Sequence, residues 1–205
     1  MRNLDFENLA YCEINGTLIF LDIINDRYFQ LADRENRIVV DSLQQSGGAD
    51  WHQPSWLPKP QDLKNVQRAS ARIEDGSFNL AEVARALWVQ RRVERRLASK
   101  GFASTLRHLS DILARRSCQL PVSSIGACRT ISAFDQSRLI RSAADRCLAR
   151  SIALAICLAA RGFRAEVFIG VKLAPFGAHC WVQAGEEILN ESVEEALRYK
   201  IILAI

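Results

Sequence analysis

No run of apolar residues in this 205-residue chain is long enough to cross a membrane. The longest uncharged apolar stretch, Ile152 to Ala160, covers nine residues between two arginines, whereas a transmembrane helix needs about 20. The first residues, Met1 to Glu7, lack the apolar segment of a secretory signal. We therefore expect a cytoplasmic protein that does not insert into a membrane.

Cysteine and histidine are also sparse. Six cysteines without a C-x-x-C pair are too few for a disulfide scaffold, so we expect reduced thiols. The three histidines stand far apart, at positions 52, 108 and 179, and none has the neighbouring ligands of a zinc site. The chain also lacks a G-x-x-x-x-G-K-[ST] loop for nucleotide phosphates. We expect neither a metal nor a cofactor.

Charge is distributed unevenly along the chain. Residues 1–80 carry 8 Lys/Arg and 12 Asp/Glu, residues 81–150 carry 14 and 5, and residues 151–205 carry 5 and 6. An acidic first part followed by a basic middle favours two modules. The basic block includes Arg85, Arg91, Arg92, Arg95 and Arg96. It is either a solvated helix face or a surface for an anionic partner, and no aromatic residues alternate with the arginines as nucleic-acid stacking requires.

The first module, residues 1–76, begins with a strand pattern. Asn15-Gly16 is the strongest hairpin signal, since a type I′ turn needs two positive φ angles. Strands over 11–14, 17–24 and 27–31, with a two-residue Asn25-Asp26 turn, predict an antiparallel meander. A helix over 34–45 follows, capped by Asp33. Its predicted buried stripe is Ile38, Val39 and Leu43.

The rest of this module is irregular in pattern. Trp51 to Pro60 contains three prolines and must be extended or irregular. A short helix over 61–72 and a linker at Asp75-Gly76-Ser77 complete the module. Three strands with helices predict a small winged-helix-like unit.

The second module, residues 77–205, begins with helices. Asn79 caps a helix over 80–100 that ends at Gly101, with an apolar face of Leu80, Val83, Ala84 and Leu87. A second helix covers 104–116. A third covers 136–161 and ends at Gly162, with Asp135 or Asp145 as the cap of its start or of a restart.

Strands then follow over 165–171, 179–183 and 187–190, so the chain as a whole is predicted to be α+β. In this order a cysteine, Cys147, opens a buried helix, and a histidine, His179, lies on a later strand. A thiol at a helix start tends toward thiolate, and a histidine on a neighbouring strand can accept its proton. The alternative is that Cys147 is a small buried apolar residue like Cys157 and Cys180. The residues alone leave both interpretations open.

These segments resemble a known family. Cys147-Leu148 with its alanine-rich helix, Phe168-Ile169-Gly170-Val171 and the block 175–182, PFGAHCWV, are similar to the lasso peptide B proteins. In that family a transglutaminase-like, papain-like cysteine protease removes the leader from a lasso peptide precursor. Residues 21–29, LDIINDRYF, resemble the strand pair of its fused leader-recognition domain.

The resemblance implies roles for particular residues. Cys147 would be the nucleophile and His179 the base. The family's third member is an aspartate 12 residues after the histidine, where this chain has Glu191 preceded by Asn190. Either side chain can accept the imidazole N–H. The third role therefore stays open between these two.

The resemblance also implies partners. They are the leader of the precursor and an asparagine-synthetase-like cyclase that uses ATP and the freed α-amine. The leader would add as a strand to the edge of the predicted meander, with contacts at Tyr28, Phe29 and Leu31. Because side chains alternate along a strand, one of Tyr28 and Phe29 should line the peptide groove and the other should fill the core. Two other functions remain open: an acyl transferase, or an inactive peptide-binding factor.

Overall fold

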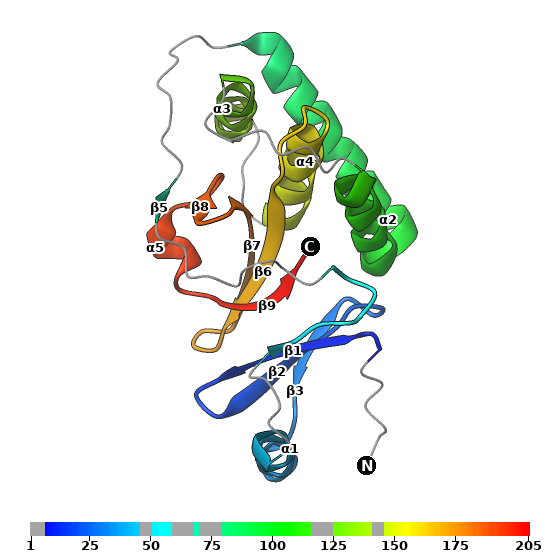
Figure 1. The fold of residues 1–205 in the computed structure, drawn as a ribbon, viewed down its shortest axis with the longest axis vertical. Coiled ribbons are helices and arrows are strands. Elements are labelled where there is room, and N and C mark those ends of the chain that lie inside the picture. The colour runs from blue at the N-terminus through cyan, green and yellow to red at the C-terminus, as the bar shows by residue number, and fades with distance from the viewer. Residues whose placement is uncertain (1–6, 46–50, 59–67, 70–78, 116–124, 141–145) are drawn as a thin grey trace.

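The computed structural model describes residues 7–45, 51–58, 68–69, 79–115, 125–140 and 146–205. It is an α+β structure with two sheets and helices around them (Figure 1). The predicted linker at 75–77, the module boundary at 76 and the alternative cap Asp145 lie outside the described residues. No helix within the described ranges has the length and apolar character needed to span a membrane.

The N-terminal sheet confirms the predicted meander. Its strands are β1 (Leu9–Ile14), β2 (Thr17–Asp22), β3 (Arg27–Gln30) and β4 (Trp51–His52), in the order β3-β2-β1-β4. The β1–β2 turn has positive φ at both central residues, 51° at Asn15 and 78° at Gly16, as a type I′ turn requires. Because β3 is first in the strand order, it is an edge strand of this sheet.

The β2–β3 connection is longer than predicted. β2 ends at Asp22 and pairs there with Arg27, so the loop has four residues rather than the two-residue Asn25-Asp26 turn. The cause is local: a carboxylate oxygen of Asp22 accepts hydrogen bonds from the backbone N–H groups of Ile24 and Asn25. These bonds turn the chain before residue 24 can continue the ladder.

Helix α1 (Asp33–Gln45) covers one face of the N-terminal sheet. The residues packed together there are Tyr11, Leu18, Phe20, Phe29, Leu31, Val39, Val40 and Leu43. The predicted inclusion of Ile38 is wrong, because its side chain is 53% exposed and Val40 takes its place in the contact. A sheet with one helix is compatible with the predicted small unit, and the winged-helix comparison stays a prediction.

Helix α2 (Leu80–Arg115) contains the predicted break at Gly101, where φ is 78° and ψ is 175°. The Asn79 side chain accepts hydrogen bonds from the N–H groups of Ala81 and Glu82, which confirms the cap. The second half starts earlier than residue 104, directly after this break.

The buried face of α2 differs from the predicted one. It runs through Val83, Ala86 and Val93, whereas Leu80 and Ala84 are exposed and Leu87 is half-buried. Both sides of this helix carry apolar residues, and packing against α4 rather than sequence pattern selects one of them.

The predicted helix over 136–161 is divided between two helices, and the first of them begins earlier than predicted. Helix α3 (Ile125–Ile140) and helix α4 (Cys147–Ala159) are separate elements. Asp135 is inside α3, not at a helix start, and its carboxylate accepts a hydrogen bond from Arg150 of α4 at 2.9 Å. The buried Arg150 side chain of α4 thus bonds to a residue of α3, and the two helices contact each other.

The C-terminal sheet contains the three predicted strands and two more. They are β5 (Arg68–Ala69), β6 (Glu166–Lys172), β7 (Gly177–Ala184), β8 (Glu187–Ile188) and β9 (Lys200–Ala204), in the order β5-β8-β7-β6-β9. β5 contradicts the predicted helix over 61–72 at Arg68–Ala69, where pairing with β8 prevails. The third predicted strand ends at Ile188 rather than Asn190. Neither the short helix α5 (Val193–Ala196) nor β9 was predicted.

One hydrophobic core joins the two predicted modules. It includes Ala10, Cys12, Ile19 and Leu21 from the N-terminal sheet and Ile23 directly after β2, with residues of α2, α3, α4, β6, β7 and β9. The N-terminal sheet thus lies between α1 and the C-terminal part (Figure 1). A buried hydrogen bond from the Ala204 N–H to the Gln53 side chain, 3.0 Å long, also crosses this junction.

Candidate active site

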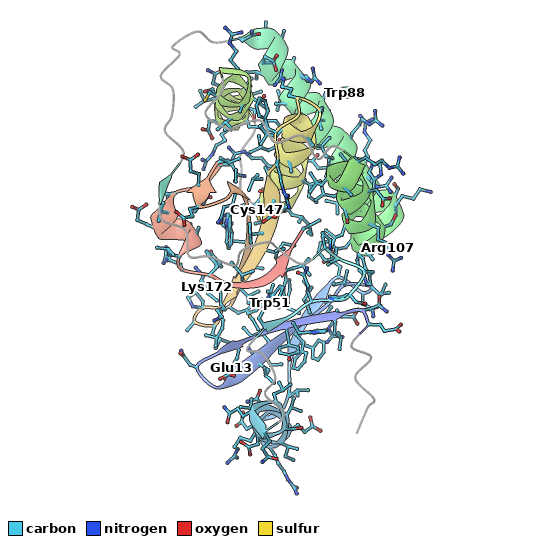
Figure 2. All side chains as sticks on the ribbon, viewed as in Figure 1. Glu13, Trp51, Trp88, Arg107, Cys147 and Lys172 are labelled. Atoms are coloured by element: carbon cyan, nitrogen blue, oxygen red, sulfur yellow. The ribbon has the colours of Figure 1, made fainter. Side chains whose placement is uncertain are left out.

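Cys147 is the first residue of α4, at the end of the helix that faces the N-terminal sheet (Figure 2). The following residues, from Ala149 to Ala155, are buried, so the apolar sequence of α4 fixes the helix in the core. The Cys147 side chain itself is half-buried. Because Cys147 begins α4, its side chain is at the positive end of the helix dipole, as the sequence predicted.

His179 and Glu191 come from the C-terminal sheet and the segment after it. His179 lies on β7, and its Nε2 is 2.9 Å from Oε2 of Glu191. The other carboxylate oxygen of Glu191 accepts a hydrogen bond from the Ser192 N–H at 3.0 Å. Both oxygens of Glu191 are therefore used, and the imidazole ring is held from its Nε2 side.

The structure brings Cys147 and His179 into hydrogen-bond contact. Burial alone would raise the pKa of the Cys147 thiol, but the hydrogen bond and charge of His179 lower it below its ordinary value. Backbone N–H groups of Cys180 and Leu148 act in the same direction. Because Nε2 faces Glu191, the ring nitrogen left for the thiol is Nδ1.

His179 shifts in the opposite direction. Burial opposes its protonation, yet the hydrogen bonds to Cys147 and Glu191 raise its pKa to about 9. The same contact with His179 lowers the pKa of Glu191. A lowered thiol pKa beside a raised imidazole pKa favours a thiolate–imidazolium pair at neutral pH.

Other thiols of the core are shifted the other way. Burial raises the pKa of Cys12 to about 12 and also raises those of Cys157 and Cys180. Cys157 and Cys180 are thus buried apolar residues, as expected from the sequence. Cys147 differs from them by its contact with His179.

Asn190 does not contact His179 in this arrangement. Its Oδ1 accepts a hydrogen bond from the Val182 N–H at 2.7 Å, and its Nδ2 donates to Ser151 Oγ at 3.0 Å. Ser151 Oγ in turn donates to the carbonyl oxygen of Cys180. Asn190 therefore ties the strand segment to α4, while Glu191 is the residue that meets the imidazole.

Two aromatic residues around His179 were not singled out by the sequence analysis. The centroid of its ring is 5.3 Å from that of Tyr199 and 6.4 Å from that of Trp181. Lys172 Nζ lies over the Tyr199 ring, 4.9 Å from its centroid. Trp181 could have been found from its i+2 spacing to His179 on one strand. Tyr199 could not, since it precedes the strand that was not predicted.

The three predicted leader-binding residues separate onto two faces of the N-terminal sheet. Phe29 stacks on Phe20, with ring centroids 5.1 Å apart, and packs with Leu31 near α1. Tyr28 points the other way, toward the C-terminal part, and its ring contacts that of Phe176 at 5.7 Å. The predicted alternation of Tyr28 and Phe29 is therefore confirmed.

The basic block of the sequence lies on α2. Arg85, Arg91, Arg92 and Arg95 are exposed, whereas Arg96 is half-buried and donates to the Ser104 carbonyl. The Arg92 guanidinium lies 5.1 Å from the centroid of the Trp88 ring. This block is not part of the Cys147 site.

No group of three or more His, Cys, Asp and Glu side chains suited to a metal ion occurs in the ranges that the structure describes. A family model described as the transglutaminase-like superfamily matches residues 86–204. This range includes Cys147, His179 and Glu191 but not the N-terminal sheet. Neither the curated proteins nor the solved structures include a significant match to the chain.

Proposed function

This chain belongs to the transglutaminase-like superfamily, and from that membership and its site we propose that it is a cysteine peptidase that removes the leader from a lasso peptide precursor. The superfamily is broad and accounts for peptidase or acyl-transfer chemistry at a thiol. The choice of substrate comes from the sequence resemblance to the lasso peptide B proteins.

The observation that supports this proposal best is the contact chain from Cys147 through His179 to Glu191. A helix-start thiol with a lowered pKa, a histidine with a raised one and a carboxylate 2.9 Å from the second ring nitrogen are the parts of a cysteine nucleophile site. A purely structural cysteine needs none of these.

In the proposed reaction the Cys147 thiolate attacks the carbonyl carbon of the last leader residue. The C–N bond then breaks, a thioester forms between leader and Cys147, and the His179 imidazolium gives its proton to the departing core amine. Water, deprotonated by the now neutral His179, hydrolyses the thioester. The products are a leader carboxylate, a core peptide with a free α-amine and the regenerated thiol.

Glu191 orients the imidazole in this scheme. Its Oε2 holds Nε2, which leaves Nδ1 directed at the sulfur, and its charge favours the imidazolium that must form. The backbone N–H of Cys147 is the proposed donor to the oxyanion, since it lies at the start of α4.

The N-terminal sheet would hold the leader. β3 is an edge strand, and an extended peptide can pair with such an edge through main-chain hydrogen bonds. Tyr28, Phe29 and Leu31 remain the proposed contacts, on the two faces of that strand. The freed core would pass to an asparagine-synthetase-like cyclase, which supplies the ATP chemistry.

The direct test is incubation of the purified chain with a lasso precursor, followed by mass spectrometry of the products. Cys147→Ala should abolish cleavage by several orders of magnitude while the leader still binds. Cys157→Ala is the matched control, since this thiol is buried on the same helix, and it should retain cleavage. Cleavage by the Cys147→Ala chain would refute the nucleophile assignment.

A second measurement separates hydrolysis from acyl transfer. In water enriched in ¹⁸O, a peptidase places one label in the new leader carboxylate. With a primary amine in excess, an acyl transferase instead gives a leader amide. A chain that binds the leader but gives neither product would be an inactive binding factor.

A further inference from the structure

Tyr28 is a residue of β3, the edge strand proposed to hold the leader. In the β2–β3 ladder it pairs with Leu21, a residue of the core shared by both modules, whereas Phe29 pairs with Phe20 on the α1 face. The side chain of Tyr28 therefore leaves the edge strand toward the C-terminal part.

Tyr28 meets an aromatic residue of the C-terminal part there. The ring of Phe176 stands edge-on to it, at 62° and 5.7 Å between centroids. Phe176 belongs to the β6–β7 turn, three residues before His179, and is 51% exposed. The pair thus joins the strand proposed to hold the leader with the turn that leads into the histidine strand.

The same side chain packs against the core that Cys147 also contacts. Burial raises the pKa of the Tyr28 hydroxyl, and the charges of Cys180, Asp26 and Cys147 raise it further. The phenol therefore stays neutral and is within electrostatic range of Cys147.

We infer that Tyr28 and Phe176 form a specificity-determining subsite for an apolar side chain in the last residues of the leader. This inference rests on the proposed function. A peptide paired with β3 that continues to Cys147 must leave the strand edge near this pair, and an exposed aromatic ring offers apolar contact area. The subsite is made by both predicted modules, one ring from each.

The test is a set of enzyme and precursor variants measured for leader affinity and for kcat/KM. Tyr28→Ala and Phe176→Ala should each lower kcat/KM about 10-fold or more, the effect of lost apolar contact in a substrate pocket. Leader affinity, measured by fluorescence anisotropy, should fall in Tyr28→Ala, because Tyr28 is a proposed leader contact, and should change little in Phe176→Ala. Trp88→Ala is the matched control, since this aromatic residue is 58% exposed on α2 and should leave both quantities unchanged.

Coupling identifies the substrate residue. Each of the last leader residues is replaced by alanine in turn, and at one position the Phe176→Ala penalty should disappear. If the kcat/KM losses of Phe176→Ala and of the leader substitution were additive at every position, the subsite would be overturned. Tyr28→Phe should cleave like the unmodified chain, because the ring is retained, and a loss equal to that of Tyr28→Ala would assign the effect to the hydroxyl and also overturn it.

Folding and function are controlled separately. Thermal unfolding of each variant shows whether it folds, and the exposed Phe176 carries the test if Tyr28→Ala does not. If the unmodified chain cleaves the precursor but no coupling is found, only this inference fails. If the unmodified chain does not cleave at all, the proposed function fails and the subsite fails with it.

Discussion

Cys147 differs from the chain's buried thiols in what surrounds its sulfur. His179 and two backbone N–H groups lower its pKa, whereas burial raises those of Cys12, Cys157 and Cys180. At pH 7 we expect iodoacetamide to alkylate Cys147 well ahead of these three. Peptide mapping after a time course measures this. Because the thiol pKa is lowered, the advantage should persist at neutral pH and decline only as the pH falls through that pKa.

His179→Ala provides the control for this labelling. Without the imidazole the burial of Cys147 would dominate, and its alkylation at pH 7 should slow toward that of the other thiols. Equal labelling of Cys147 in both chains would contradict the thiolate–imidazolium pair.

Glu191 and Asn190 should differ in a pH profile. Glu191 raises the pKa of His179, which is about 9, so kcat/KM should fall as the pH rises through that value and the imidazolium is lost. Glu191→Gln removes the charge and keeps the size. It should move this alkaline limb to lower pH and reduce turnover, by up to about 10⁴-fold if the tautomer is mis-set.

Asn190→Ala is the matched comparison. It removes hydrogen bonds to Val182 and Ser151, so we expect lower stability, by about 1–3 kcal/mol, with the alkaline limb unmoved. If Asn190→Ala shifted the alkaline limb of the kcat/KM profile and Glu191→Gln did not, Asn190 rather than Glu191 would be the residue that orients His179.

The sequence could not choose between these neighbours. The spacing from His179 placed the third residue at position 190 or 191, and both types can accept an imidazole N–H. The choice depends on long-range contacts. Asn190 is buried and bonds to Val182 and Ser151, whereas Glu191 contacts His179.

Gly170 shows how one element makes room for the site. It is opposite His179 in the β6–β7 ladder. A methyl group there would lie 2.8 Å from the Cβ of Tyr199 and 2.9 Å from the Trp181 ring. We expect Gly170→Ala to destabilise the chain by about 1–3 kcal/mol and to lower kcat/KM, since both rings flank His179. Thermal unfolding and precursor cleavage measure the two effects.

Gly126→Ala is the control for that substitution. Gly126 is in α3, and an added methyl there would be 3.5 Å from the Phe163 ring, an ordinary contact. Its unfolding temperature should be unchanged or slightly higher, because alanine favours helix. A larger loss at Gly126 than at Gly170 would contradict the packing around His179.

Elements were predictable where the signal is local. The Asn15-Gly16 turn, the Asn79 cap and the Gly101 break all depend on neighbouring residues, and all are confirmed. The buried face of α2 depends on which helix packs against it. Because apolar residues lie on two sides of α2, the sequence pattern alone did not predict that face correctly. β9 was missed because its role is long-range: it completes the sheet beside β6.

At the scale of the whole molecule, the core shared by the two modules was not predicted. A change from acidic to basic composition predicted two modules, and the family match begins near that change. Yet the face of the N-terminal sheet with Ile19 and Leu21 belongs to the same core as α4. The distribution of charged residues reflects the protein surface, and it cannot predict whether two apolar faces pack into one core.

This shared core predicts that the chain unfolds as one cooperative unit. Ile19 is fully buried at the junction, so Ile19→Ala should cost about 2–5 kcal/mol. The loss should appear at Cys157, far along the chain in α4: its labelling by a thiol reagent in denaturant should begin at a lower concentration, together with the change in circular dichroism. Ile24→Ala in the same sheet module is the control, since Ile24 is 53% exposed, and it should leave both midpoints in place. If Ile19→Ala instead produced an early transition that left Cys157 protected, the two modules would unfold separately, and the shared core would not couple them.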